Sequence, residues 1–395
     1  MDHPIVLAFS GGLDTSFLIP YLKKKTGSPV VAVHVDTGGS TREQLDAIAR
    51  RAKELGALEI RIVDAKKTYF ADVISYLIKG NILRGEVYPL CVGAERVTQA
   101  RELVKVARDL NARQVAHGST AAGNDQVRFE IYFRVLAPEM EILAPVRDEK
   151  LTRKIEVDYM NAHGFPVSAE KARYSINRGL WGTTIGAREF QDPACPIPEE
   201  AYRPVTSTES KTIRIGFESG IPVSLDGKRL DPVSLIEKVS ELAYPLGIGR
   251  GIHLGNTVVG IKGRIAFEAP AAAVLLPAHR ELEKLVTTKW QTFWKRELSQ
   301  FYGDLLHEGH YFDPVLRDIE AYLDRSQERV TGSVLVKLAP FRCQVEGCES
   351  NFSMTGGSLG VYGEEALSWT GEEARGFAKL NSIPAQLWHG AERKS

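Results

Sequence analysis

The sequence lacks the features that mark several specialised classes of protein. Its 395 residues include only 4 cysteines, too few for a disulfide scaffold of the kind that stabilises small secreted domains. Basic and acidic residues are equal in number, 50 of each, so the net charge of zero provides no strongly basic surface for nucleic acid and marks no acidic partner. We therefore expect ordinary reduced cysteines and no nucleic-acid partner.

Long hydrophobic runs are absent as well. The longest, "APAAAVLLPAH" at 269–279, is far shorter than a membrane span and contains two prolines. The N-terminal segment "MDHPIVLAFSGG" has an acidic second residue and no cleavage-like site, so it does not resemble a signal peptide. Cys343 and Cys348 stand in "CQVEGC" with no further His or Cys close by, so we predict no metal site there. The predicted location is cytoplasmic, without membrane contact.

What the sequence does contain suits two folded domains, because 43% of its residues are hydrophobic and the chain is long for one core. The first 150 residues alternate apolar, strand-like runs with segments of helical periodicity. The predicted strands are 5–9, 30–37, 58–65, 113–120 and 140–148, and the predicted helices are 14–25, 41–57, 69–81 and 95–112. This repetition predicts an α/β domain with a doubly wound parallel sheet over residues 1–165. Ligands bind such a sheet at the carboxyl ends of its strands.

The regular alternation of strand-like and helical segments ends after about residue 165, and residues 166–395 are predicted to form an α+β domain. The Gly- and Pro-rich segment 174–204 is predicted to form long loops that line another part of the molecule. Two alternating runs around turns predict hairpins over 212–230, and Asp-Pro begins a predicted helix at 231–247. The remaining elements are a strand-like region at 250–268, one long helix over about 273–303, a helix over 313–330, two late alternating segments and a C-terminal helical arm.

The segment "SGGLDTS" follows the first predicted strand directly and opens the first predicted helix. Gly11 and Gly12 allow a tight bend with exposed backbone N–H groups, and Ser10, Thr15 and Ser16 add hydroxyl groups. The positive end of the following helix dipole favours an anion at the same place. The spacing matches neither a Walker loop nor GxGxxG. We interpret the segment as a cradle for phosphate or pyrophosphate.

A second glycine-rich loop lies within "AHGSTAAGNDQVRFE" at 116–130. Gly118 and Gly123 make the loop flexible, and Asn124, Asp125 and Arg128 gather polar groups at its end. A plainer interpretation is a solvated loop whose Asn-Asp pair caps a helix. Residue types alone do not decide between the two.

Both segments resemble known families. "SGGLDTS" is the signature of the PP-loop ATP pyrophosphatases, which have an adenine nucleotide alpha hydrolase-like fold, and 116–130 is similar to "HGxTGxGNDQVRFE" of argininosuccinate synthases. The resemblance continues in "YSINRGLWG", "GRIAFEAP", "HRELEKL" and "SQERVTGSV", so it covers most of the chain. The sequence is identified as a member of the argininosuccinate synthase family.

The resemblance implies an ATP-dependent ligase of arginine biosynthesis that condenses L-citrulline with L-aspartate. Citrulline would be activated as an adenylate, with release of pyrophosphate and then AMP, and Mg²⁺ would accompany the ATP. A nucleotide-binding domain (1–165), a synthetase and multimerisation domain (166–395) and a homotetramer built with the C-terminal arm are also implied. No covalent nucleophile is needed, because orientation and charge stabilisation supply most of the acceleration.

The resemblance also implies roles for particular residues. The expected ATP-binding residues are Ala8, Phe9, Ser10, Gly11, Gly12, Leu13, Asp14, Thr15, Ser16, Val35 and Gly118. The expected aspartate-binding residues are Thr120, Asn124 and Asp125, and the expected citrulline-binding residues are Tyr88, Asn124, Arg128, Ser175 and Thr184. Asp14, Asp125 and Arg128 are the expected catalytic residues.

The citrulline side departs from the family pattern. Gly93 and Thr184 each replace a serine, Gly255 replaces a glutamate and Phe267 replaces a tyrosine. Each hydrogen bond lost to a charged group costs about 1.5–3 kcal/mol, so uncompensated losses would weaken binding severely. Two alternatives follow. Either neighbours compensate, of which the candidates are Glu268, His253 and Asn256, or the acceptor is a different ureido or amide compound.

Other classes of protein share the first motif. A tRNA-modifying PP-loop enzyme would be expected to carry a basic extension or a catalytic Cys pair, and the sequence has zero net charge and no CxxC. An amidotransferase of the GMP or NAD synthetase kind needs an ammonia source, and no glutaminase segment is evident. A degenerate nucleotide-binding scaffold is disfavoured by the intact Ser10, Asp14, Asn124, Asp125 and Arg128.

Overall fold

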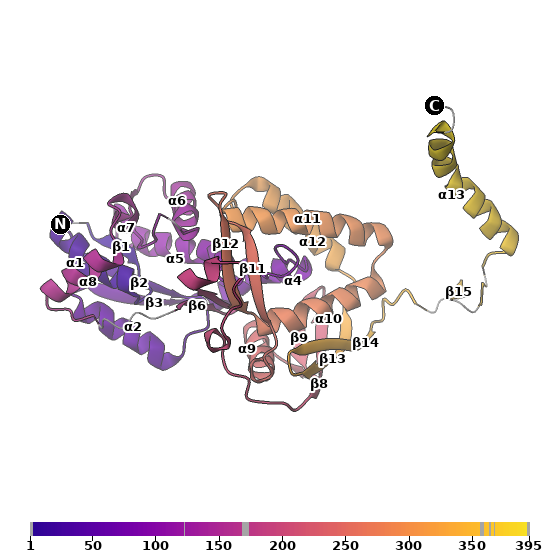
Figure 1. The fold of residues 1–395 in the computed structure, drawn as a ribbon, viewed down its shortest axis with the longest axis horizontal. Helices are drawn as coiled ribbons and strands as arrows, with labels where there is room; N and C mark the ends of the chain where they lie inside the picture. The colour runs from indigo at the N-terminus through magenta and orange to yellow at the C-terminus, as the bar shows by residue number, and fades with distance from the viewer. Residues whose placement is uncertain are drawn as a thin grey trace. The chain divides into compact units, whose positions relative to one another are not determined.

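A five-stranded parallel sheet organises the N-terminal part of the chain, with the strand order β3-β2-β1-β4-β5 (Figure 1). The structure is a computed structural model that describes residues 3–121, 123–167, 174–355, 359–362, 365–366 and 368–392. It divides into two compact units, Met1–Asn351 and Phe352–Ser395. The strands of the parallel sheet are β1 (Ile5–Ala8), β2 (Val30–Asp36), β3 (Glu59–Asp64), β4 (Gln114–Ala116) and β5 (Glu141–Leu143).

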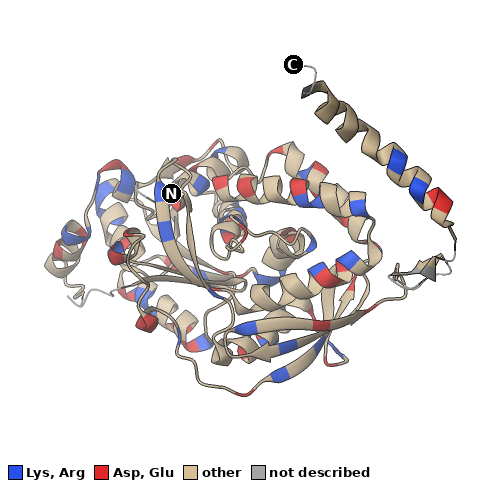
Figure 2. Ribbon diagram, turned by 45° about the vertical axis from the view of Figure 1, so that its right-hand side comes forward, with Lys and Arg blue, Asp and Glu red and all other residues tan. Residues whose placement is uncertain are grey.

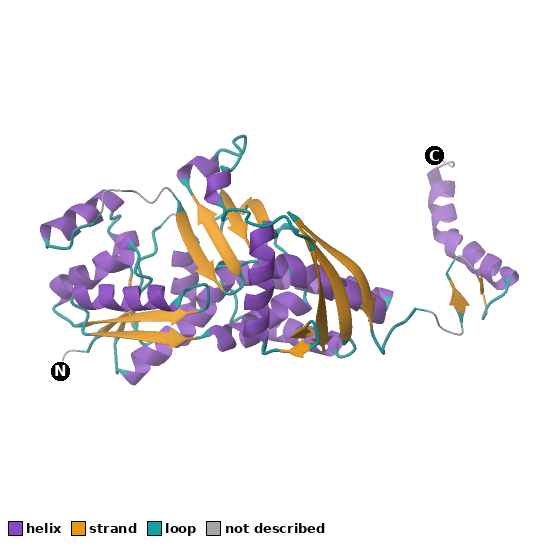
Figure 3. Cartoon of the chain, turned by 90° about the horizontal axis from the view of Figure 1, so that it is seen from below, coloured by secondary structure: helices purple, strands orange, loops and turns teal. Residues whose placement is uncertain are grey.

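Helices cover both faces of this sheet because its central strands β1 and β2 are buried on both sides (Figure 3). Ile5 and Leu7 of β1 pack with Phe17 in one apolar cluster, whereas Val6, one residue along, belongs to the cluster on the other face. The helices of this part include α1 (Leu13–Thr26), α2 (Arg42–Glu54), α5 (Arg96–Asp109), α6 (Asp125–Leu136), α7 (Pro145–Asp148) and α8 (Arg153–Ala162). The predicted doubly wound parallel sheet is confirmed.

The strand order reverses between β1 and β4, and this reversal places the two motif loops next to each other. β1 pairs with β2 on one side and with β4 on the other, all in parallel. The first motif follows β1 and the second follows β4, so both leave the same edge of the sheet from neighbouring strands. The topology therefore brings together two segments that lie about a hundred residues apart in the sequence.

Two antiparallel sheets and a set of helices complete the first unit, as an α+β fold. One sheet has the order β10-β9-β8-β13-β14 and the other β11-β12-β7-β6. Their strands are β6 (Ser175–Gly179), β7 (Gly182–Gly186), β8 (Lys211–Glu218), β9 (Ile221–Leu225), β10 (Lys228–Arg229), β11 (Arg250–Asn256), β12 (Lys262–Glu268), β13 (Gly332–Ala339) and β14 (Arg342–Glu349). The longer helices are α9 (Pro232–Ala243), α10 (Pro270–Val286), α11 (Lys289–Glu308) and α12 (Pro314–Gln327).

The prediction of one long helix over 273–303 is wrong. The backbone is extended at Thr287 and Thr288, and a new helix begins at Lys289. Thr288 and Gln291 form a reciprocal capping box, in which each side chain binds the backbone N–H of the other residue. The Thr-x-x-Gln spacing was therefore the signal of a helix start within the apolar pattern.

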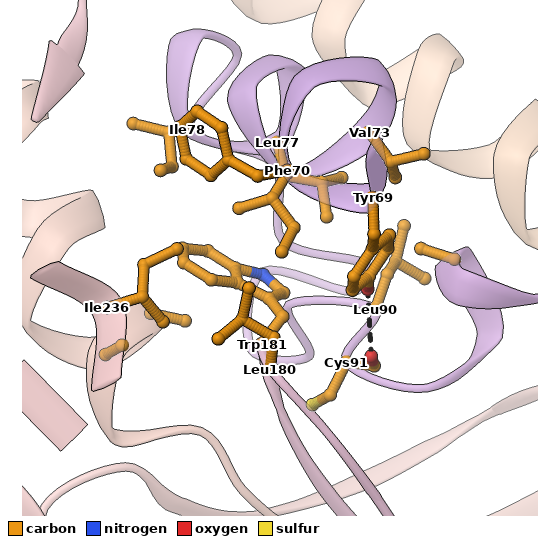
Figure 4. Close-up of a cluster of buried hydrophobic side chains, with 14 of the residues drawn as sticks. Tyr69, Phe70, Val73, Leu77, Ile78, Leu90, Cys91, Leu180, Trp181 and Ile236 are labelled. Carbon is orange, nitrogen blue, oxygen red and sulfur yellow. Dashed lines mark hydrogen bonds between the residues drawn. The ribbon is translucent and has the colours of Figure 1, made fainter. Parts of the chain in front are cut away.

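The prediction of long loops over 174–204 is wrong for its first third, where β6 and β7 form a hairpin. The buried Trp181 anchors the turn, and its indole Nε1 donates to the Pro89 carbonyl at 3.0 Å. Trp181 packs there among side chains of distant segments, including Phe70, Leu90 and Ile236 (Figure 4). Phe70 lies in a π-helical turn (Phe70–Ile74) between α3 (Lys66–Tyr69) and α4 (Ser75–Lys79). One core thus joins the N-terminal and C-terminal parts of the first unit.

The second unit contains β15 (Gly360–Val361), β16 (Glu365–Ala366) and the helix α13 (Gly371–Glu392), which matches the predicted C-terminal helical arm. In the first unit, basic and acidic residues are interspersed along helices and strands (Figure 2). None of the helices in the described part of the chain is both long and apolar enough to cross a bilayer.

A buried polar cluster ties α10, α11 and α12 to the end of α4. The Lys295 ammonium donates to the Glu283 carboxylate at 2.6 Å and to the Lys79 carbonyl at 2.8 Å. The same carboxylate accepts from Gln327 at 2.7 Å and from Asn81 at 2.9 Å. Lys295 and Glu283 are 3% and 2% exposed, so each charge depends on its partner for solvation.

Replacing Lys295 by methionine should therefore lower the free energy of unfolding by about 3–5 kcal/mol, because it leaves the buried Glu283 carboxylate without a counter-ion. Urea unfolding followed by circular dichroism measures this change. The matched control is Arg296→Met, an exposed position on the same helix, which should change stability by less than about 0.5 kcal/mol. Equal unfolding midpoints for the two variants would contradict the role of the ion pair.

Candidate functional site

The loop between β1 and α1 is fixed by its own hydrogen bonds. Gly11 has a φ of +79°, and a Cβ there would lie 3.0 Å from Ile48 Cγ1, so the bend requires glycine. Ser10 Oγ accepts from the Gly12 N–H at 3.3 Å, and the Thr15 hydroxyl donates to the Gly12 carbonyl at 3.3 Å. These hydrogen bonds hold the loop in its tight bend.

Gly12 is the N-cap of α1 and makes no side-chain capping bond. The first N–H groups of an α-helix have no intrahelical acceptor, and the helix dipole adds positive potential at the same end. Ser10, Gly12, Leu13, Asp14 and Thr15 all line a cavity above this turn. The arrangement can hold the oxygens of a phosphate or pyrophosphate group.

One cavity of about 780 Å³ brings together most of the residues that the sequence predicts for the site. The predicted residues that line it are Ala8, Phe9, Ser10, Gly12, Leu13, Asp14, Thr15, Val35, Tyr88, Gly118, Thr120, Asn124, Asp125, Arg128, Ser175 and Thr184. Gly11 and Ser16 do not line it. Ser16 is buried behind the loop, where its hydroxyl donates to the Gly11 carbonyl at 3.4 Å.

Asp125 is held between two guanidinium groups at the centre of the cavity wall. One carboxylate oxygen accepts from Arg96 Nε at 2.9 Å and the other from Arg128 Nη1 at 2.8 Å. Burial opposes ionisation of Asp125, but the two arginines outweigh burial and lower the pKa of its carboxyl. The carboxylate therefore stays charged and orients both arginines.

Sequence reasoning missed Arg96, which lines the cavity from the first turn of α5. The only signal was a basic residue at the start of a predicted helix, where acidic residues are the more favourable choice. Arg96 also donates to the buried Glu95 at 2.9 Å. Burial raises the pKa of Glu95 to about 7.

Sequence reasoning also missed His307, which reaches the cavity from α11. Arg128 Nε donates to the His307 carbonyl at 2.8 Å, and Arg128 Nη2 donates to His307 Nδ1 at 3.1 Å. Burial and the adjacent Arg128 lower the pKa of His307, which keeps the imidazole neutral and able to accept. Asn124 makes a comparable link, since its side-chain oxygen accepts from the Val258 N–H at 2.9 Å. Arg128 and Asn124 therefore join the second motif loop to distant segments.

Of the four positions that depart from the family pattern, Gly93, Thr184 and Gly255 line this cavity, and Phe267 packs against Tyr88, which also lines it. A Cβ on Gly93 would lie 3.1 Å from Arg128 Nη2, so the guanidinium uses the space that a serine side chain would need. A Cβ on Gly255 would lie 2.5 Å from His253 Nε2, so the imidazole uses the space there. Tyr88 stacks on His253 with ring centroids 5.2 Å apart and packs against Phe267 at 5.3 Å.

The three candidate compensating residues differ in whether they line the cavity. His253 and Asn256 line the cavity. Glu268 lies outside its lining, where its carboxylate accepts from the Arg203 N–H at 3.0 Å.

His117 lines the cavity beside the first loop. Its Nδ1 accepts from the Ser119 N–H at 3.3 Å, and its ring stacks on Phe129 with centroids 5.7 Å apart. Burial lowers the pKa of His117 to about 4, so the ring is neutral near pH 7.

The described residues contain no group of three or more His, Cys, Asp or Glu side chains that could hold a metal ion by itself. The carboxylate nearest the phosphate cradle is Asp14, and Glu156 of α8 lies beside it. Burial and the Asp14 carboxylate raise the pKa of Glu156. Asp14, which lines the cavity beside the cradle, is positioned to contact a cation that arrives with a nucleotide.

Comparisons with known proteins identify the family of this chain. The family described as "Arginosuccinate synthase N-terminal HUP domain" matches residues 4–166, and "Arginosuccinate synthase C-terminal domain" matches residues 174–388. The argininosuccinate synthase of Methanocaldococcus jannaschii is 38% identical over 398 residues, covering 100% of both chains. Those of Dictyoglomus turgidum and Chlorobium luteolum are each 39% identical and cover 97% and 96% of both chains, respectively. The resemblance predicted from the motifs is confirmed, and this chain belongs to the argininosuccinate synthase family.

Proposed function

We propose that this chain is an argininosuccinate synthase, an ATP-dependent C–N ligase that condenses L-citrulline with L-aspartate and releases AMP and pyrophosphate. The observation that carries the proposal is the shared cavity, in which the anion cradle of α1 faces the polar loop of residues 118–128. Full-length relatives at 37–39% identity support the same activity.

In the first step, the ureido oxygen of citrulline attacks the α-phosphorus of ATP, and the bond to the β-phosphate breaks. The products are citrullyl-adenylate and pyrophosphate. The N–H groups at the start of α1 and the hydroxyls of Ser10 and Thr15 stabilise the charge that develops on the leaving group. Val35 and Gly118, which line the same cavity, are proposed to contact the adenosine.

In the second step, the amine of aspartate attacks the activated ureido carbon and AMP leaves with the electron pair of the broken C–O bond. Thr120, Asn124 and Asp125 are proposed to hold aspartate, and Tyr88, Asn124, Arg128, Ser175 and Thr184 to hold citrulline. A carboxylate has about four acceptor sites, so Asp125 can accept from a substrate ammonium while it binds Arg96 and Arg128. Arg128 positions the acceptor, and Asp125 positions Arg128.

Mg²⁺ is proposed to accompany ATP. The described residues offer Asp14 rather than a protein cage, which fits an ion held mostly by phosphate oxygens and water. When bound, the ion would neutralise triphosphate charge.

The other properties implied by the resemblance stay predictions. These are a cytoplasmic location, a place in arginine biosynthesis, a homotetramer, and the division into nucleotide-binding (1–165) and synthetase (166–395) domains. Apolar side chains exposed on α13 support assembly with another copy, because a helix that keeps such residues in water gains free energy when they are covered. They are Phe377, Leu380, Leu387 and Trp388.

The proposed activity predicts that AMP and pyrophosphate form only when ATP, Mg²⁺, aspartate and citrulline are all present. Coupled assays of both products, with each component omitted in turn, measure this dependence. Turnover with another ureido or amide compound and none with citrulline would instead favour a family ligase with a different acceptor. Turnover with ammonia in place of aspartate would contradict the assignment.

Replacing Gly12 by valine should abolish measurable ATP binding. The φ of Gly12 is −72° and the atom nearest to an added Cβ is Ser10 Oγ at 3.4 Å, so the fold accepts a side chain that then projects into the cradle. Isothermal titration with ATP measures the effect, and the exposed Gly347→Val serves as control. ATP affinity equal to that of the unmodified chain would show that the polyphosphate does not approach this turn.

Replacing Asp125 by asparagine should raise the KM for aspartate far more than the KM for ATP. Asparagine keeps the shape of the side chain but removes the charge that orients Arg96 and attracts the substrate ammonium. Steady-state kinetics with each substrate varied separately provide the comparison. Proportionate increases in both KM values would place Asp125 outside the aspartate subsite.

A further inference from the structure

The face of β11 that lines the cavity carries one imidazole between two glycines. Gly251, His253 and Gly255 alternate along the strand and so share one face. Ile252 and Leu254 point the other way and are 41% and 54% exposed, whereas His253 is 8% exposed. Among Gly251, His253 and Gly255, His253 therefore supplies the polar side chain, and Asn256 at the end of the strand also lines the cavity.

Packing fixes the orientation of His253. Tyr88 stacks on its ring at an interplanar angle of 21°, and the missing side chain at Gly255 leaves room for Nε2. This nitrogen is buried and has no hydrogen-bond partner among the described residues. An unpaired buried polar atom is costly, and His253 lines the cavity, so a bound ligand whose acceptor reaches Nε2 would remove this cost.

The charges around His253 favour an anionic partner. The carboxylates among the described residues that line the cavity are Asp14, beside the phosphate cradle, and Asp125, which two arginines already bind. Burial and the adjacent Arg84 lower the pKa of His253, so the ring is neutral near pH 7. Arg84 itself pairs with Asp304 at 3.5 Å, and the neutral imidazole can donate a hydrogen bond to a carboxylate.

The position of His253 in the cavity indicates which substrate carboxylate it would bind. In the proposed reaction the ureido group of the acceptor lies at the α-phosphate, between the α1 turn and the 118–128 loop. The amino-acid end of the acceptor then extends toward Tyr88 and β11, both of which line the same cavity.

We propose that His253 is a specificity-determining residue for the acceptor, and that its Nε2–H donates to the acceptor's carboxylate. This inference rests on the proposed function. It gives the acceptor's carboxylate a hydrogen-bond donor beside Gly255, where the family pattern has a glutamate.

The test compares His253→Phe, which keeps a ring against Tyr88 but removes Nε2, with His253→Gln, which keeps a polar N–H. For His253→Phe we expect the citrulline KM to rise at least about tenfold, while the KM values for ATP and aspartate stay within about twofold. His253→Gln should recover part of the loss. The control is Leu254→Ala, on the exposed face of the same strand, which should leave all three KM values unchanged.

A second arm uses citrullinamide, in which the carboxylate is neutralised. The unmodified chain should prefer citrulline over citrullinamide by at least about tenfold in kcat/KM, and His253→Phe should lose this preference. An unchanged citrulline KM, an equal rise in all three KM values, or a preference retained in His253→Phe would overturn the role of His253. Absence of citrulline turnover by the unmodified chain would instead overturn the proposed function, so the two failures are distinguishable.

Discussion

The ion-pair bridge in which Asp125 binds Arg96 and Arg128 is the interaction on which the candidate site depends. It joins the start of α5 to the start of α6, and through Arg128 it reaches His307 on α11. Charge-assisted hydrogen bonds of this kind are strong and directional, and here both arginines are buried while Asp125 is partly exposed to the cavity. The bridge therefore fixes the distance between the β4 loop and the C-terminal half of the first unit, and with it the shape of the cavity.

The parallel sheet supplies the second constraint. Because β1 and β4 are neighbours, the phosphate cradle and the polar loop leave the same sheet edge. This part of the site could be predicted from the sequence, since local motifs and the rule for parallel sheets suffice. Arg96, His307 and the orientation of His253 could not, because they reach the cavity from α5, α11 and β11, whose positions depend on tertiary packing. The hairpin at 175–186 was not predicted because its glycines obscure the alternating pattern of a strand. The break at Thr288 could have been predicted, because the Thr-x-x-Gln capping box is present in the sequence.

The departures from the family pattern have a common physical form. A glycine stands where a polar side chain is usual, and a neighbouring side chain occupies the space, Arg128 at Gly93 and His253 at Gly255. At Gly93 the neighbour is Arg128, which belongs to the family motif itself, so only the serine contact is absent there. At Gly255 the neighbour is His253, and the proposed hydrogen bond from its Nε2 would add a donor for the acceptor's carboxylate.

The most direct test of the account is a crystal structure of the protein with a non-hydrolysable ATP analogue and aspartate. The β- and γ-phosphates should lie against the N–H groups of residues 11–15, with the α-phosphate facing the loop of residues 118–128. A polyphosphate bound elsewhere, with the first turn of α1 in contact only with solvent, would contradict the central claim that this turn holds the departing pyrophosphate.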